Sequence, residues 1–249
     1  FTSPPYASQR KYDESSGFTP IKPDDYCEWF EGVAANVKAH LAGNGSWFVN
    51  IKAHCEDGQR SLYVHDLVTA HVREWGWRFV DELIWNKSDP FPGFYTGRFK
   101  NAFEPIFHFA LSAGFPFNPE AVGVVSDTSF RSEDVTQKSG PGLGKNEQLT
   151  ASMRTGLSLP SNVVTLGAGA NSDGGHEAAF PVKLPAWFIR AYSNKRDTVF
   201  DPFMGSGSTL IAADNEDRVA LGMELSPAYC DVICQRFEQH TGVAPMLDS

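Results

Sequence analysis

Two short segments at opposite ends of the 249-residue chain carry residue types that could hold a small ligand, and the first is Ser3-Pro4-Pro5-Tyr6. Each proline fixes its own φ angle, lacks an N–H group and restricts the residue before it, so the segment is extended and pre-set. The carbonyl groups of such a corner are expected to lack sheet partners. A surface turn would use the same residues, so the segment alone leaves both interpretations open.

The second segment is DPFMGSG at residues 201–207, which follows a strand-like run and precedes a helix-like one. Gly205 and Gly207 allow the backbone to approach a ligand. The letters match neither GxGxxG nor GxxxxGK, so a dinucleotide fingerprint and a phosphate loop are not predicted. Asp201 could accept a hydrogen bond from an amino group, and Glu224, at the end of the next strand, could accept from two ribose hydroxyls. The pattern favours a nucleoside ligand without a pyrophosphate, such as S-adenosylmethionine, over a simple tight helix entry.

The elements that would position these segments alternate between strands and helices, which predicts an α/β sheet. Apolar residues at helical spacing and short buried runs give the expected boundaries. Helices are predicted over residues 24–41, 62–74, 184–192, 207 onward and 226–239, and strands over 47–51, 77–85, 105–111, 198–201 and 219–224. The last part of the chain therefore reads as a βαβα unit, with its glycine-rich turn where doubly wound sheets bind nucleotides.

Taken together, several segments resemble the amino-methylating DNA methyltransferases of the permuted, beta-type arrangement. TSPPY resembles the catalytic motif of that family, DPFMGSGST its S-adenosylmethionine motif, and RVALGMELSPAYCDVICQRF the following strand and helix. The middle segment, with WNK and a later FEPI, is similar to the family's strand, loop and strand, although members often carry HE-x-I at the latter place. HEAAFPVKLPAWFIRAYS looks like the segment before the cofactor motif. The resemblance implies a Rossmann-like fold with a mixed, mostly parallel sheet and helices on both faces.

The resemblance also implies which residues would act, because the family's motifs align with positions of this chain. The exocyclic amine of an extruded base would donate to the Ser3 hydroxyl and the Pro4 carbonyl, Pro5 would keep the corner stiff, and Tyr6 would stack on the base. S-adenosylmethionine would be held by the cofactor motif and by the segment before it. The cofactor residues implied are Asp201, Pro202, Phe203, Gly205, Ser206, Gly207, Glu224, Phe180 and Pro181.

The residue before the prolines bears on the reaction expected. A serine there is commoner in the cytosine-N4 branch of the family than in the adenine-N6 branch, so cytosine N4 is favoured and adenine N6 stays open. No cysteine stands beside the prolines, which argues against methylation at carbon 5, and no metal is required. Trp85 and Lys87 follow a strand, so they are candidates for the border of the target pocket. The fold would act on double-stranded DNA, as a monomer or a homodimer.

The chain is predicted to divide into three parts. Residues 1–111 form the catalytic half, residues 112–175 a target-recognition or lid insertion, and residues 176–249 the cofactor-binding half. The middle part is rich in Gly, Ser, Asn and Asp, and a loop of that length is usually either functional or disordered. Its side chains suited to reading base edges are Arg131, Lys138, Asn146, Gln148 and Arg154.

Composition limits these expectations. A formal net charge of -9 argues against non-specific binding to nucleic acid, although it allows a local basic cleft. That leaves open an RNA or small-amine methyltransferase, and a catalytically silent nucleic-acid-binding module. Four cysteines suit a reducing, cytoplasmic compartment, and Cys230 and Cys234 are expected on a buried helix face rather than at a metal. The first residue is Phe1, so we expect a piece of a longer chain.

Overall fold

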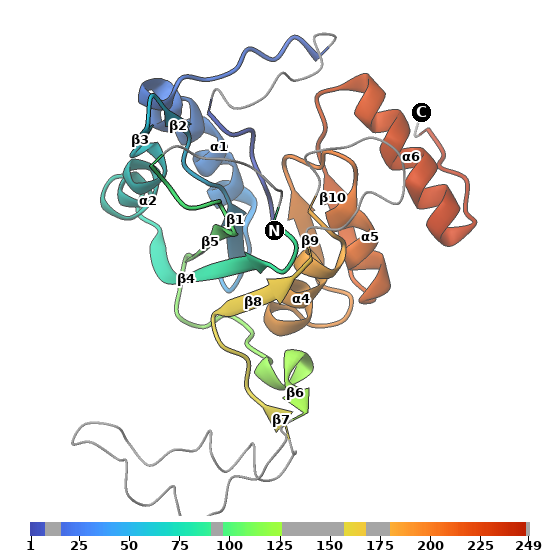
Figure 1. Ribbon diagram of the computed structural model, residues 1–249. Coiled ribbons are helices and arrows are strands. Elements are labelled where there is room, and N and C mark those ends of the chain that lie inside the picture. The colour runs from blue at the N-terminus through green and yellow to red at the C-terminus, as the bar shows by residue number, and fades with distance from the viewer. Residues whose placement is uncertain (8–15, 91–96, 126–156, 168–179, 248–249) are drawn as a thin grey trace, which may run out of the picture.

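The computed structural model describes residues 1–7, 16–90, 97–125, 157–167 and 180–247, and its centre is a mixed sheet in the order β1-β5-β4-β8 (Figure 1). The strands of this sheet pair both ways: β5 is antiparallel to β1 and β4, whereas β8 is parallel to β4. The four strands are β1 (Ser46–Asn50), β5 (Phe103–Ala110), β4 (Arg78–Lys87) and β8 (Val163–Leu166).

Alternating side chains divide the core between the two faces of this sheet. On β1, Trp47 and Val49 enter the cluster formed with α1 (Tyr26–His40) and α2 (Tyr63–Arg73). Phe48 points to the opposite face, where it joins Phe188 of α4 (Lys183–Tyr192). Because successive residues of a strand face opposite sides, the consecutive buried residues Trp47, Phe48 and Val49 need cover on both faces of the sheet. The sheet is therefore the middle of three layers.

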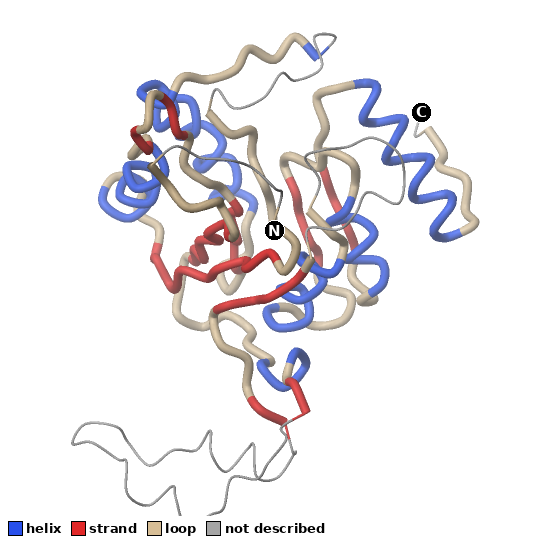
Figure 2. The backbone as a smooth tube through the Cα atoms, in the orientation of Figure 1, coloured by secondary structure: helices blue, strands red, loops and turns tan. Residues whose placement is uncertain are grey.

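A second, two-stranded sheet carries the glycine-rich turn. It pairs β9 (Thr198–Asp201) in parallel with β10 (Val219–Gly222), with α5 (Ser208–Asn215) between them in sequence and α6 (Pro227–Thr241) after them. Figure 2 shows the two groups of strands on either side of the N-terminal segment. Parallel strands joined by a helix place their carboxyl ends, and the loops that follow, at one edge of the sheet.

Thr2 connects the two sheets. Its backbone N–H donates to the Phe48 carbonyl at 2.9 Å and its carbonyl accepts from the Asn50 N–H at 2.8 Å, beside β1. Its hydroxyl donates to Asp201 Oδ1 at 2.6 Å, at the end of β9. The first residues of the chain thus lie against residues that are 199 positions later in the sequence.

The predicted helices and strands all occur, with boundaries shifted by a few residues. The sequence suggested a mostly parallel sheet, but the two sheets together have as many antiparallel as parallel ladders. The smaller elements are η2 (Pro23–Asp25), β2 (Cys55–Glu56), β3 (Gln59–Arg60), η3 (Pro119–Val122), β6 (Val124–Val125) and β7 (Leu157–Ser158).

The stretch 112–175 contributes β8 to the central sheet, so this part of the predicted insertion pairs within the core. Its five candidate base-reading residues lie outside the described residues.

One prediction about packing is wrong. Cys230 and Cys234 were expected on a buried helix face, but both are exposed, and no residue of α6 is buried. The helical spacing was recognised correctly, but α6 lies at the margin of the molecule, where its partly apolar face has little to pack against. No described helix is long and apolar enough to cross a membrane.

Candidate functional site

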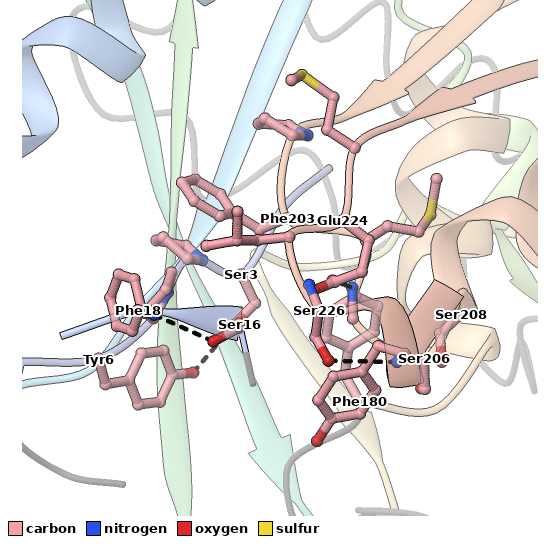
Figure 3. Close-up of a pocket in the computed structure, with 18 of the residues that line it drawn as sticks. Ser3, Tyr6, Ser16, Phe18, Phe180, Phe203, Ser206, Ser208, Glu224 and Ser226 are labelled. Atoms are coloured by element: carbon pink, nitrogen blue, oxygen red, sulfur yellow. Dashed lines mark hydrogen bonds between the residues drawn. The ribbon is translucent and has the colours of Figure 1, made fainter. Parts of the chain in front are cut away.

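One cavity of about 420 Å³ brings the two ends of the chain together. Ser3, Pro4, Pro5 and Tyr6 line one side, and the turn after β9 lines the other. Figure 3 shows Ser3 and Tyr6 facing the side chains of Ser206 and Ser226 across this space. We call the first side the catalytic wall (residues 3–6) and the second the cofactor wall (residues 202–206 and 223–226). Pockets for small ligands typically span roughly 300 to 1,000 Å³, so this cavity has the size of a ligand site.

Hydrogen bonds hold the catalytic wall from behind. The Tyr26 hydroxyl of α1 donates to the Pro5 carbonyl at 2.6 Å, and the Tyr6 hydroxyl donates to Glu104 Oε2 at 2.9 Å. The Ser3 hydroxyl lies 3.4 Å from the Tyr6 oxygen. No donor from the described residues reaches the Pro4 carbonyl. The corner is thus fixed at Pro5 and Tyr6, while Ser3 and Pro4 keep acceptor capacity at the cavity.

Glu104 is a buried carboxylate in β5, a strand whose other residues are apolar except for His108. It is 4% exposed, and its Oε1 accepts from Lys52 Nζ at 2.9 Å and from Lys87 Nζ at 2.7 Å. Burial alone would raise the pKa of Glu104, but the charges and hydrogen bonds of the two lysines outweigh burial and lower it. Glu104 is therefore ionised at neutral pH. Sequence reasoning passed over this residue, although a single charge within FEPIFHFA was a signal that it needed partners.

Asp201 has a different position from the one predicted. It is fully buried beneath the cofactor wall and does not line the cavity. Its Oδ1 accepts from the Thr2 hydroxyl and from the Phe203 N–H at 3.0 Å, and its Oδ2 accepts from the Thr209 hydroxyl at 2.7 Å. In this geometry Asp201 is buried away from the cavity and accepts from three protein donors, so its contact with a ligand amino group stays a prediction. The carboxylate holds the turn.

Glu224 does face the cavity, as predicted. Its Oε2 accepts from the Gly205 N–H at 2.8 Å and its Oε1 from the Ser226 N–H at 2.9 Å. Each carboxylate oxygen has two lone pairs, so both oxygens can still accept a hydroxyl from a ligand. The same side chain therefore shapes the turn and presents acceptors.

The two predicted glycines have different surroundings. Both have positive φ, +55° at Gly205 and +85° at Gly207. A Cβ on Gly205 would meet no atom within 4 Å, whereas a Cβ on Gly207 would lie 3.3 Å from Ile233 Cγ1 of α6. Gly205 lines the cavity and Gly207 does not. Next to them, Arg236 of α6 donates to the carbonyl and to the hydroxyl of Ser206.

Most of the other predicted residues also lie at the cavity. Pro202, Phe203, Ser206 and Phe180 line it, while Pro181 does not. The Pro181 carbonyl instead accepts from the Leu184 N–H at the start of α4.

Several lining residues were not predicted. Trp29 of α1 lines the cavity with its ring centroid 6.0 Å from that of Phe203, and Ser16 and Phe18 come from the segment before α1. Ser226 caps α6 by accepting from the Tyr229 N–H. A serine before a proline is a signal for a helix start, so Ser226 could have been found from the sequence. Trp29 could not, because its helix alone does not show which face meets the turn.

Trp85 and Lys87, considered for the border of a target pocket, have separate roles in the structure. Trp85 is buried and its indole N–H donates to the Leu166 carbonyl at 3.1 Å. Lys87 lies over the Trp85 ring, 4.4 Å from its centroid, and reaches Glu104. Only Lys87 is thus linked to the catalytic wall, through Glu104 and Tyr6.

A family model provides the decisive comparison. The model of the N6/N4 methyltransferases, described as DNA methylase, matches residues 1–235. The chain belongs to this DNA methylase family. The order of its motifs, with TSPPY before DPFMGSGST, is the order in which the two walls of the cavity occur along the chain.

Named relatives agree with this membership. The type II methyltransferase M.PvuII of Proteus hauseri is 26% identical over 95% of this chain and 76% of its own length. The type II methyltransferase M.BglI of Bacillus subtilis is 50% identical over a shorter part, 22% of this chain and 16% of its own length.

Solved structures share the fold. The PvuII DNA methyltransferase, named as cytosine-N4-specific, superposes with a TM-score of 0.71 at 23% identity, covering 97% of this chain and 82% of that one. A complex of M1.HpyAVI with S-adenosylmethionine gives a TM-score of 0.59 at 19% identity, covering 95% of this chain and 86% of that one. The α/β methyltransferase fold predicted from the sequence is thus confirmed.

S-adenosylmethionine is the cofactor of this family, and the cavity fits it. Glu224 offers carboxylate oxygens suited to ribose hydroxyls, and Phe180, Phe203 and Trp29 offer apolar faces suited to a purine ring. Gly205 leaves open space beside the backbone.

Proposed function

We propose that this chain methylates the exocyclic amine of a base extruded from double-stranded DNA, with cytosine N4 as the target atom. The observation that carries the proposal is the shared cavity: a rigid corner with a serine hydroxyl and a carbonyl acceptor faces a nucleoside-type site across one space. Family membership supports the DNA methyltransferase activity, and the residue-level assignment is our own.

The chemistry needs acceptors held in advance. The amine of cytosine or adenine is conjugated with its ring, so its lone pair is a weak nucleophile. Ser3 Oγ and the Pro4 carbonyl would accept the two N–H bonds and favour the pyramidal nitrogen that forms as the new bond develops. When bound, S-adenosylmethionine supplies an electrophilic methyl carbon on a sulfonium, so transfer forms the N–C bond, leaves the C–S electron pair on sulfur and releases one amine proton.

Cytosine N4 is favoured over adenine N6 for two reasons. A serine precedes the prolines, as in the cytosine branch that the motif resembles. The solved structure that superposes with a TM-score of 0.71, a match that covers 82% of its chain, is named as cytosine-N4-specific.

Exposed cationic side chains near the start of β5 support DNA as the partner, despite the net charge of -9. The loop that leads into β5 carries exposed Lys100 and Phe99, the latter 97% exposed, and it is tied to the β2–β3 hairpin by Arg60, which donates to Asn101 Oδ1 at 3.0 Å. Figure 1 shows this loop passing beside the hairpin. Exposed cations suit contacts with phosphates, and an exposed aromatic ring suits contact with an unstacked base step. Residues 112–175 remain our candidate for base-specific recognition.

The test is methyl transfer from labelled S-adenosylmethionine to duplex DNA, followed by digestion and identification of the modified nucleoside. We expect N4-methylcytosine, and we expect Ser3→Ala to abolish it. N6-methyladenine would keep the reaction but change the base. Transfer only to RNA or to a free amine, or turnover that persists in Ser3→Ala, would refute the proposal.

Cofactor binding is tested separately by thermal unfolding with S-adenosylhomocysteine. A ligand at about 100 times its Kd that binds only the folded form stabilises it by about 2.7 kcal/mol. Glu224→Ala should remove most of this stabilisation, because the acceptors for the ribose and the hydrogen bonds that shape the turn are lost together. Glu238→Ala, in the exposed part of α6, is the matched control and should retain it.

A further inference from the structure

Glu104 lies behind the catalytic wall and does not line the cavity, yet it is connected to Ser3 through a single side chain. The connection runs from the Ser3 hydroxyl to the Tyr6 hydroxyl and from there to the Glu104 carboxylate. A second acceptor, Asn50 Oδ1, lies 3.4 Å from the Tyr6 oxygen, farther away than the 2.9 Å contact to Glu104. Because hydrogen bonds to an ionised acceptor are shorter and stronger, the tyrosine hydrogen goes to Glu104.

The charge of Glu104 fixes the direction of every hydrogen bond in this connection. An ionised carboxylate can only accept, and both of its lysine partners can only donate. Tyr6 has one hydroxyl hydrogen and gives it to Glu104, so toward Ser3 the tyrosine oxygen can only accept. Ser3 also has one hydroxyl hydrogen, which this arrangement directs toward Tyr6. The remaining lone pairs of Ser3 are then available to the cavity as acceptors.

We propose that Glu104 is a positioning residue that, through Tyr6, sets Ser3 as a hydrogen-bond acceptor and so selects an amino group over a keto oxygen at the reacting position. The inference rests on the proposed function and deepens it. A base with a keto oxygen at this place would present lone pairs to the lone pairs of Ser3 and Pro4, whereas an amine would satisfy both acceptors. Specificity of this kind depends on leaving buried polar groups unpaired with the wrong ligand.

The competing explanation is that Glu104 only neutralises Lys52 and Lys87. In that case its removal would change stability, and removal of the Tyr6 hydroxyl would leave catalysis unchanged. The two explanations thus differ in the response of kcat to Tyr6→Phe, a substitution that keeps the ring and leaves the pair of lysines with their carboxylate.

The experiment compares Tyr6→Phe, Glu104→Gln and the double variant with the parent chain in the duplex-DNA methylation assay. We expect Tyr6→Phe to lower kcat by about 100-fold, the size of effect seen when a pre-set hydrogen-bonding group is removed from an active site. Stabilisation by S-adenosylhomocysteine should be unchanged, because the cofactor wall is intact. Glu104→Gln should also lower kcat, since an amide can donate to Tyr6 and reverse the direction of the bonds.

The double variant distinguishes positioning from simple neutralisation. If both residues act through one connection, Glu104→Gln should lower kcat little further in the Tyr6→Phe background. Tyr63→Phe is the matched control: its buried hydroxyl donates to the Lys52 carbonyl at 2.6 Å, in the same neighbourhood, and kcat should be retained.

Each outcome decides the inference. A Tyr6→Phe variant with the parent's kcat, or two effects that multiply in the double variant, overturns it and leaves the proposed function standing. A parent chain that methylates no amine overturns the proposed function and this inference with it. If Glu104→Gln does not fold, the kcat of Tyr6→Phe against Tyr63→Phe decides alone.

Discussion

The two walls of the cavity each depend on one buried carboxylate, and the two carboxylates have different partners. Asp201, beneath the cofactor wall, is bonded by hydroxyls and a backbone N–H. Glu104, behind the catalytic wall, is bonded by two lysine ammonium groups and a tyrosine hydroxyl. Neutral donors fix the position of a carboxylate, while cations also fix its ionisation. The comparison suggests that the cofactor wall depends on geometry alone and the catalytic wall on charge as well.

The largest expected effect is a loss of stability when the carboxylate beneath the cofactor wall is removed. Asp201→Ala leaves the Thr2 and Thr209 hydroxyls and the Phe203 N–H buried without their acceptor, so we expect a loss of roughly 3 to 5 kcal/mol in the free energy of unfolding. Asp201→Asn keeps an oxygen for Thr2 and Phe203 and can donate to Thr209, so it should lose less than half as much. Urea unfolding measures both. Equal losses would mean that the charge of Asp201, rather than its geometry, holds the wall.

The next effect concerns the strand that carries Glu104. Burial lowers the pKa of His108 on β5 to about 3, and burial, opposed by a hydrogen bond to the Leu67 carbonyl, lowers the pKa of His71 to about 4. Both pKa values lie below the ordinary histidine value of 6.5, so below pH 6.5 the unfolded chain binds protons that the folded chain does not. Stability present above pH 6.5 is therefore lost as the pH falls toward 4 and then 3.

At about pH 5 this amounts to about 2 kcal/mol for each histidine relative to about pH 7.5. Urea unfolding at the two pH values checks it. A free energy of unfolding that stays constant down to about pH 5 would contradict the burial of these rings in the folded state.

A smaller effect separates the two glycines of the turn after β9, of which Gly205 belongs to the cofactor wall and Gly207 follows it. Gly207→Ala combines a left-handed φ with a close approach to Ile233, and we expect it to destabilise the fold by about 2 kcal/mol; Gly205→Ala, with open space, should cost about 1 kcal/mol. Gly32→Ala, at an exposed position of α1, should instead stabilise the fold by roughly 0.5 to 1 kcal/mol. Thermal unfolding of the three variants measures the order. Equal losses of stability for Gly205→Ala and Gly207→Ala would show that α6 shifts to make room for the added methyl group.

The smallest effect lies outside both walls. Lys100→Ala should weaken binding to duplex DNA about equally for all sequences and lower the slope of log affinity against log salt by about 1, because one phosphate contact is lost. Lys195→Ala, an exposed lysine of the other half paired with Asp217, should leave both quantities unchanged. A titration of fluorescent DNA at several salt concentrations measures both. If the two variants changed DNA affinity equally, the proposal that DNA binds on the side of the catalytic wall would be wrong.

The helices, the strands and the two walls could be predicted because each depends on residue patterns that are local in the sequence. Apolar spacing marks α1 and α2, and the glycine turn marks the end of β9. The burial of Asp201 was not predicted, because one of its partners, Thr2, comes from the other end of the chain and the other, Thr209, comes from the next helix. The local sequence predicts that a residue lies at the start of a turn, whereas long-range contacts decide which way its side chain faces.

The same limit explains Glu104 and Cys230. The two lysine partners of Glu104 are Lys87, at the end of β4, and Lys52, two residues after β1, so only the sheet order shows that one carboxylate meets both. For Cys230, helical periodicity correctly gave the helix, but burial depends on what covers α6. Whether other elements cover an amphipathic face depends on the tertiary arrangement, and the periodicity of the sequence does not predict it.

The bond between Thr2 and Asp201 has a consequence for the synthesis of the protein. Thr2 leaves the ribosome well before Asp201, which is made 199 residues later. Until then the amino-terminal corner has only half of its enclosure, and a nascent chain lacks a complete reaction chamber. The cavity can therefore be enclosed only after residue 201 and the segment that carries Glu224 have been made.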